Sequence, residues 1–190
     1  METSKLNLNR RQAVKMTATL LGVGIIGADF FLSGCARKAT KIEGITESVI
    51  NLLDEVGETI LPETPDSLGA KAAQIGLFIK AIVEDCYSPA EQHIFITGIN
   101  TLEERAMDQY NTIFVDLPAE TKLELLSVID VEASKNEAET PIHYFSMMKQ
   151  LTLWGYFSSE IGATQALRYN KVPQEFKGCI PYKEGDKAWV

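Results

Sequence analysis

Apolar side chains recur every three or four positions from residue 45 to residue 60, which is the spacing of an amphipathic helix. They are Ile45, Val49, Leu52, Leu53, Val56 and Ile60. Pro62 ends this pattern, and the turn-forming residues that follow predict a loop that closes at Gly69. A second helix is predicted from Ala70 to about Cys86, with an inward side formed by Ile75, Phe78, Ile79, Ile82 and Val83.

Three further helices are predicted from start signals in the sequence. In Ser88–Glu91 a serine cap, a proline and a glutamate form a capping box, and the helix should run to about Tyr110. Its inward residues are expected to be Ile94, Phe95, Ile99, Leu102 and Ala106. Leu117-Pro118 opens a fourth helix, whose apolar side is Leu123, Leu126, Val128 and Ile129. Thr140-Pro141 opens a fifth, with a stripe of Ile142, Phe145, Met148 and Leu151 and a possible continuation at Leu153-Trp154.

A shorter helix is expected from Ser158 or Ser159 to near Leu167, and the chain changes character from about residue 168. The last 23 residues contain prolines, glycines and aromatic residues without a helical period. They predict an ordered, extended arm that lies on the chain's own helices or on a partner. No long alternating pattern of a strand occurs. The expected fold is therefore mostly α, a compact bundle of about five to six helices with an extended, aromatic-rich C-terminal arm.

The first 34 residues predict an export signal. The paired Arg10 and Arg11 lie in a basic lead, an apolar run follows, and Leu32–Cys35 resembles the bacterial lipoprotein box. The paired arginines look like a twin-arginine signal, a route associated with cargo that folds before export. We expect residues 1–34 to be removed, Cys35 to carry lipid, residues 35–44 to form a tether and residues 45–190 to form the domain. The alternative is an uncleaved anchor helix.

Composition limits the partners. The chain has a net charge of −8, and without residues 1–34 about −10, which argues against nucleic acid as a ligand. The expected location is the periplasmic side of a bacterial membrane, with the membrane contact made by the lipid. Export would permit disulfides, so Cys86 and Cys179 are candidates for a bridge. The alternative is that Cys86 is a buried thiol at a helix end.

Motifs for catalysis or cofactor binding are absent from the sequence. It has no GxGxxG, P-loop, GxSxG, CxxC or CxxCH pattern, so we predict no catalytic, cofactor-binding or metal-ligating residue in this chain. His93 and His143 are interpreted as surface or rim residues. The remaining candidate is a set of aromatic residues for a partner interface: Trp154, Tyr156, Phe157, Tyr169, Phe176 and Trp189. For the first three, a well-packed helix end is an equal alternative.

Several segments resemble the gluconate 2-dehydrogenase subunit 3 family. They are Glu58–Pro62 (ETILP), Gly69–Ala73 (GAKAA), Tyr87–Glu91 (YSPAE), Leu151–Gly162 (LTLWGYFSSEIG), Tyr169–Pro173 (YNKVP), Phe176–Pro181 (FKGCIP) and Ala188-Trp189. Their order and spacing extend the resemblance from about Val49 to Trp189, and the twin-arginine signal agrees with it.

The resemblance implies a small, non-catalytic subunit of a membrane-bound sugar or sugar-acid dehydrogenase. The large partner would be a flavoprotein of the glucose–methanol–choline type that holds FAD, and a cytochrome c subunit with haem c would accept electrons. The small subunit would escort the folded flavoprotein through the twin-arginine export machinery and anchor it. Two alternatives stand beside this one. The first is a free-standing helical lipoprotein scaffold for another envelope protein, and the second is a hydrolase that uses His93 or His143.

Overall fold

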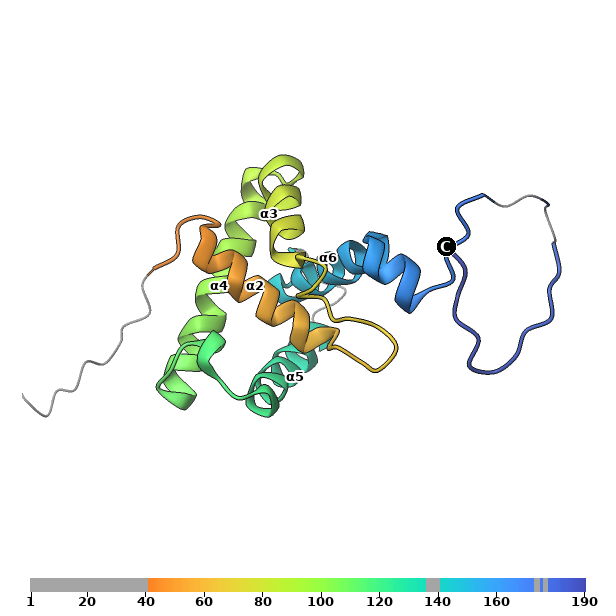
Figure 1. The fold of residues 1–190 in the computed structure, drawn as a ribbon. Helices are drawn as coiled ribbons and strands as arrows, with labels where there is room; N and C mark the ends of the chain where they lie inside the picture. The colour runs from red at the N-terminus through yellow and green to blue at the C-terminus, as the bar shows by residue number, and fades with distance from the viewer. Residues whose placement is uncertain (1–40, 136–140, 173–174, 176–177) are drawn as a thin grey trace, which may run out of the picture. The chain divides into compact units, whose positions relative to one another are not determined.

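The structure, a computed structural model, describes residues 41–135, 141–172, 175 and 178–190. In this part the chain is mostly helical (Figure 1). Its α-helices are α2 (Glu47–Ile60), α3 (Ile75–Cys86), α4 (Pro89–Tyr110), α5 (Ala119–Lys135) and α6 (Tyr144–Ser158). A 3₁₀ turn, η1 (Phe114–Asp116), precedes α5, and a π-helical turn, η2 (Gly162–Ala166), follows α6. The predicted mostly α fold is confirmed.

The helix α6 is the centre of the packing. It contacts α2, α3, α4 and α5, while α2 also packs along α3 and reaches α5. In Figure 1, α3 and α5 lie on opposite sides of α2. The core that these helices share is made of large apolar side chains with almost no exposure, among them Leu53, Ile79, Phe95, Phe114, Ile129 and Met148. Burial of such side chains is the main source of stability for a domain of this size.

Two helix starts show how local sequence sets the boundaries. At α4 the predicted capping box is present, since the Ser88 hydroxyl accepts from the Glu91 N–H and the Glu91 carboxylate accepts from the Ser88 N–H at 2.8 Å. The start of α3 was predicted too early. Residues 70–74 form turns, and Gln74 has a left-handed backbone (φ 56°), so the regular helix begins only at Ile75.

Two predictions for the later helices need correction. The residue that caps α6 is His143, whose Nδ1 accepts from the Phe145 N–H, so α6 begins later than a start at Thr140-Pro141 implies; Thr140 itself lies outside the described residues. On α5, Leu123 and Val128 are exposed rather than inward. The buried side is Lys122, Leu125, Leu126, Ile129 and Ala133. The buried side differs from the predicted one because Lys122, which pairs with a residue distant in the sequence, occupies one of the buried positions.

The last described residues form no helix. The segment that begins at Arg168 returns to its own start, where Arg168 and Trp189 form an isolated parallel bridge. The Arg168 N–H donates to the Ala188 carbonyl at 2.7 Å and the Val190 N–H donates to the Arg168 carbonyl at 3.0 Å. Tyr169, Tyr182 and Trp189 are exposed. The predicted arm that lies on the helices is therefore not confirmed, and the described part is a loop closed at its base.

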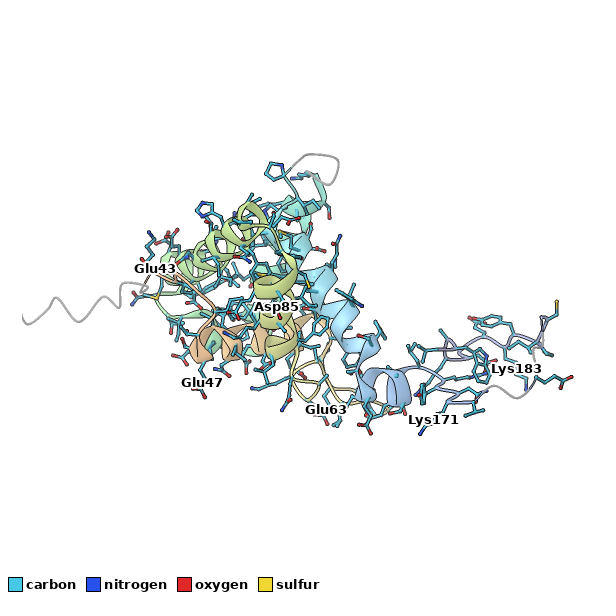
Figure 2. All side chains as sticks on the ribbon, turned by 90° about the horizontal axis from the view of Figure 1, so that it is seen from above. Glu43, Glu47, Glu63, Asp85, Lys171 and Lys183 are labelled. Carbon is cyan, nitrogen blue, oxygen red and sulfur yellow. The ribbon has the colours of Figure 1, made fainter. Side chains whose placement is uncertain are left out.

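The helical part of the chain and the segment that follows it differ in net charge. Residues 41–167 contain 7 Lys and Arg against 21 Asp and Glu, a net charge of −14, whereas residues 168–190 contain 5 against 3, a net charge of +2. Figure 2 labels examples of both: Glu43, Glu47, Glu63 and Asp85 on the helical part, and Lys171 and Lys183 after residue 168. The helical part is thus an acidic body, which disfavours contact with anionic surfaces.

Candidate partner-binding surface

The loop between α2 and α3 is held by a carboxylate at the end of α2. Glu58 accepts hydrogen bonds from the N–H groups of Glu63 and Lys71, both at 2.9 Å. Gly69 passes so close that a Cβ at this position would lie 2.2 Å from the nearer Glu58 oxygen. A larger residue at this position would displace the Glu58 carboxylate from its place under the loop. Two of the sequence segments singled out above, Glu58–Pro62 and Gly69–Ala73, meet here.

The same loop is fastened to α6 by Tyr156. The Tyr156 hydroxyl lies 2.7 Å from the Leu68 carbonyl, to which it donates, and 2.6 Å from the Ser67 hydroxyl. The Leu68 N–H donates to the Gln165 side-chain oxygen at 3.0 Å. Tyr156 is only 4% exposed, so little of its side chain is available to a partner. The Tyr156 phenol holds the loop through these hydrogen bonds. Such packing is what the alternative interpretation, a well-packed helix end, expects.

A cleft of about 310 Å³ lies between the fastened loop and the end of α6. Its apolar wall includes Leu61, Pro62, Phe157 and Ala166, and its polar rim includes Asp66 and Lys187. The ammonium of Lys187 also donates to the Gln165 carbonyl. Phe157 is partly buried, and its ring meets the Tyr156 ring edge to face at 5.2 Å. Phe157 therefore presents one side to the surface, as an interface residue would.

Trp154 lies on a part of α6 that faces outward. Its side chain is 57% exposed, and its ring meets the Phe78 ring of α3 edge to face, with 5.4 Å between the ring centres and an angle of 89°. Leu77, beside Phe78, is 49% exposed. A Cβ on Gly155 would lie 2.5 Å from the Phe78 ring, so the glycine allows this ring to lie against α6. The result is an exposed aromatic and aliphatic face across two helices.

The C-terminal loop holds two more of the predicted interface residues. Trp189 is 56% exposed and lies under the Arg168 guanidinium, 5.3 Å from its ring centre, while Arg168 also pairs with Asp186 at 2.5 Å. Tyr169 is exposed, so its side chain is accessible to a partner. Phe176 lies outside the described residues. Arg168 was not singled out from the sequence, although it closes this loop through its backbone and its side chain.

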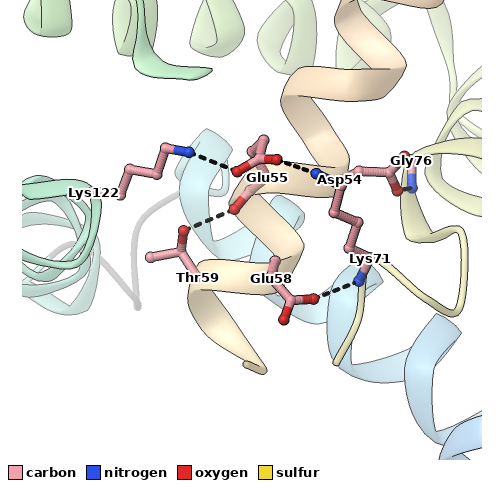
Figure 3. A network of polar contacts seen from close by, with 7 residues as sticks. All are labelled: Asp54, Glu55, Glu58, Thr59, Lys71, Gly76 and Lys122. Atoms are coloured by element: carbon pink, nitrogen blue, oxygen red, sulfur yellow. Dashed lines mark hydrogen bonds and ion pairs between the residues drawn. The ribbon is translucent and has the colours of Figure 1, made fainter. Parts of the chain in front are cut away.

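A network of charged groups joins α2 to α5 and to the loop before α3 (Figure 3). Glu55 pairs with Lys122 at 2.6 Å and with Lys71, and Asp54 accepts from the Gly76 N–H at 2.7 Å. Burial alone would raise the pKa of Glu55, but the hydrogen bonds and charges of Lys122 and Lys71 outweigh it and lower the pKa below its ordinary value. Burial raises the pKa of Asp54, with the Gly76 hydrogen bond as a partial offset. These charged groups hold α2, α5 and the loop before α3 together.

The two histidines, distant in sequence, line one cleft of about 320 Å³ between α4 and the start of α6. His93 is exposed, and His143 is partly buried, which lowers its pKa. Because the Nδ1 of His143 caps α6, that nitrogen is committed to the backbone. Within the described ranges, no group of three potential metal ligands occurs. The cleft places the histidines together, and the charges of Glu132 and Arg105 act on His143.

The cysteines are also placed by the structure. Cys86 ends α3 and Cys179 lies in the C-terminal loop, and both are exposed and free. In this structure the two thiols are not bonded to each other, and Cys86 is exposed rather than buried. Arg10, Arg11 and Cys35 lie outside the described residues. None of the described helices is long and apolar enough to cross a membrane.

Comparison with known proteins decides the family. The family model described as gluconate 2-dehydrogenase subunit 3 matches residues 47–173, more than half of the chain. The chain belongs to the gluconate 2-dehydrogenase subunit 3 family. Comparisons with curated proteins and with solved structures gave no match. The match includes all of α2 to α6. The loop between α2 and α3 and the exposed face at Trp154 therefore both lie within the part of this subunit 3 chain that matches the family.

Proposed function

We propose that this chain is the non-catalytic small subunit of a periplasmic, membrane-tethered and FAD-dependent sugar or sugar-acid dehydrogenase. The family match over residues 47–173 carries the proposal, because the family name describes one subunit of a multi-subunit dehydrogenase. In this proposal the flavoprotein partner, of the glucose–methanol–choline type, holds FAD and oxidises an alcohol group. A cytochrome c subunit with haem c receives the electrons.

The proposal gives the small subunit two tasks. The first is export, because the paired Arg10 and Arg11 form a signal for carrying a folded complex across the membrane. The second is anchoring through lipid on Cys35. Each buried acyl CH₂ contributes about 0.8 kcal/mol, so several acyl chains would hold the complex firmly. The two tasks depend on different residues, which allows them to be separated by mutation.

Purification of the tagged chain from membranes in mild detergent tests the proposal. We expect a flavoprotein of several hundred residues to co-purify, with flavin absorption bands and dye-reducing activity. Replacing Arg10 and Arg11 by lysine should leave both chains in the cytoplasm. Cys35→Ser should instead release both from the membrane after export. A lone, colourless chain would refute the stable complex and would favour a scaffold for another envelope protein.

A further inference from the structure

An exposed apolar face extends over α3 and α6, and we name it the Trp154 face. It consists of Leu77, Phe78, Ala81 and Trp154. Leu77 and Ala81 are four residues apart on α3 and therefore share one side of that helix. Trp154 projects from α6 beside them through its contact with Phe78. Trp154 lies in the last turns of a central helix and is more than half exposed, so most of its apolar surface is accessible to another molecule.

The aromatic side chains of the face are packed against both helices. The Phe78 ring lies against α6 at Gly155, where a Cβ would clash with it, and the Trp154 indole rests edge-on against that ring. Both helices that bear the face pack on the buried core through Ile79 and Leu151. A fixed aromatic group loses little conformational entropy on binding, which is why buried tryptophans are frequent hot spots of interfaces.

The charge around the face restricts the partner. Glu84 and Asp85 follow at the end of α3 and are exposed, and Glu160 follows α6. The ammonium of Lys80 donates to the Ile45 carbonyl and pairs with Glu84, so it is engaged on the side toward α2. The whole body from residue 41 to residue 167 has a net charge of −14. A complementary surface therefore offers an apolar socket with lysine and arginine side chains at its rim.

We propose that the Trp154 face binds the flavoprotein subunit, and that Trp154 enters an apolar socket with a basic rim on that subunit. This inference rests on the proposed function. The family match ends at residue 173, so it contains the whole Trp154 face and excludes most of the C-terminal loop. Membership of a dehydrogenase complex is a property of the family, and the residues that provide it are expected within the matched part.

The test uses the tagged full chain, co-purified with its flavoprotein and rebound at graded concentrations and salt. Flavin absorbance per tagged chain is the measurement. Trp154→Ala should weaken binding at least about tenfold, as expected for a hot spot. Val131→Ala is the matched control, because Val131 is 56% exposed on α5, and it should change binding less than about twofold. Helical circular dichroism of each variant verifies that the fold is kept.

A second variant tests the charge argument without disturbing the aromatic pair. Asp85→Lys should slow association at low salt, and the difference from the unmodified chain should shrink as salt rises. If the unmodified chain and Trp154→Ala carry equal flavin, the interface lies elsewhere and the inference fails while the proposed function stands. If the unmodified chain carries no flavin, the proposed function fails and this inference fails with it.

Discussion

Glu55 and Lys122 form an ion pair. Removing the Glu55 carboxylate should destabilise the fold more than replacing the Lys122 ammonium by an apolar group. The side chain of Lys122 is 10% exposed and that of Glu55 is 18% exposed. Lys122 also lies 5.8 Å from the centre of the Phe114 ring. In Glu55→Ala the ammonium stays buried without its carboxylate. In Lys122→Met an apolar side chain of similar length replaces it, and Glu55 keeps its pair with Lys71.

The magnitude follows from these exposures. Removing one partner of a fully buried pair costs about 3–5 kcal/mol, and a hydrogen bond to a charged group is worth about 1.5–3 kcal/mol. The remaining exposure of Lys122 lets water reach it in part, so we expect Glu55→Ala to lower the free energy of unfolding by about 2–3 kcal/mol. Lys122→Met should cost only about 0–1 kcal/mol, because the desolvation of the ammonium disappears together with its attraction.

Urea unfolding of the full chain, followed by helical circular dichroism, measures both values. Lys149→Met is the control, since Lys149 pairs with Asp130 at a site where both side chains are about 40% exposed. It should cost less than about 0.5 kcal/mol. The reasoning is refuted if Lys122→Met is as destabilising as Glu55→Ala. In that case the ammonium would contribute net stability, and its burial would not be the dominant cost.

The pair also predicts a pH dependence. The pKa of Glu55 is lower in the folded chain than its ordinary value of 4.5. Its contribution to stability is therefore complete above pH 4.5 and is lost as the pH falls through the folded pKa. Between pH 5 and pH 3 the unmodified chain should lose more stability than Glu55→Ala. Equal slopes for the two chains would contradict this assignment.

Three further changes have clear expected outcomes. Burial raises the pKa of Glu103, so its ionisation is unfavourable in the folded chain, and Glu103→Gln should raise the urea midpoint at pH 7 more than at pH 4. Gly76→Ala would place a Cβ 2.3 Å from a backbone carbonyl of α2 and should cost about 1–3 kcal/mol, whereas Gly44→Ala, which has open space, should be nearly neutral in the same unfolding assay. Tyr156→Phe should cost about 1–2 kcal/mol and should speed amide hydrogen exchange in residues 61–74 with little change in α4, because it releases the loop.

The helices could be predicted where local sequence decides the structure. The capping box at Ser88 and the stripe from Val49 to Val56 depend only on neighbouring residues, and both are present as predicted. The inward side of α5 could not be assigned correctly, because Lys122 is stabilised there by Glu55, which is 67 residues away in the chain. Lys122, Leu125 and Ile129 are spaced as residues on one side of a helix. This spacing indicates the buried side of α5 only if a lysine is allowed among the buried residues.

Only part of the candidate site could be predicted, because the burial of its residues also depends on contacts with residues distant in the sequence. Trp154 and Tyr156 are two residues apart in one aromatic segment, yet one faces outward and the other is buried. Which of them is buried depends on the loop of residues 67–68, whose carbonyl and hydroxyl groups bind the Tyr156 phenol. Leu77 was left off the predicted inward side of α3, in agreement with its exposure, but nothing in the sequence singled it out as part of a surface patch.

The central position of α6 has a consequence for synthesis of the chain. The helices before it share their core through α6, which ends only at Ser158. A ribosome adds about 5–20 residues per second, so roughly 6–25 s separate the appearance of residue 34 from that of residue 158. During this interval the emerging helices lack the element on which they pack. The export signal proposed for residues 1–34 would therefore be made well before the helices behind it can complete their fold, and a machinery that accepts only folded cargo would have to wait for the last helix.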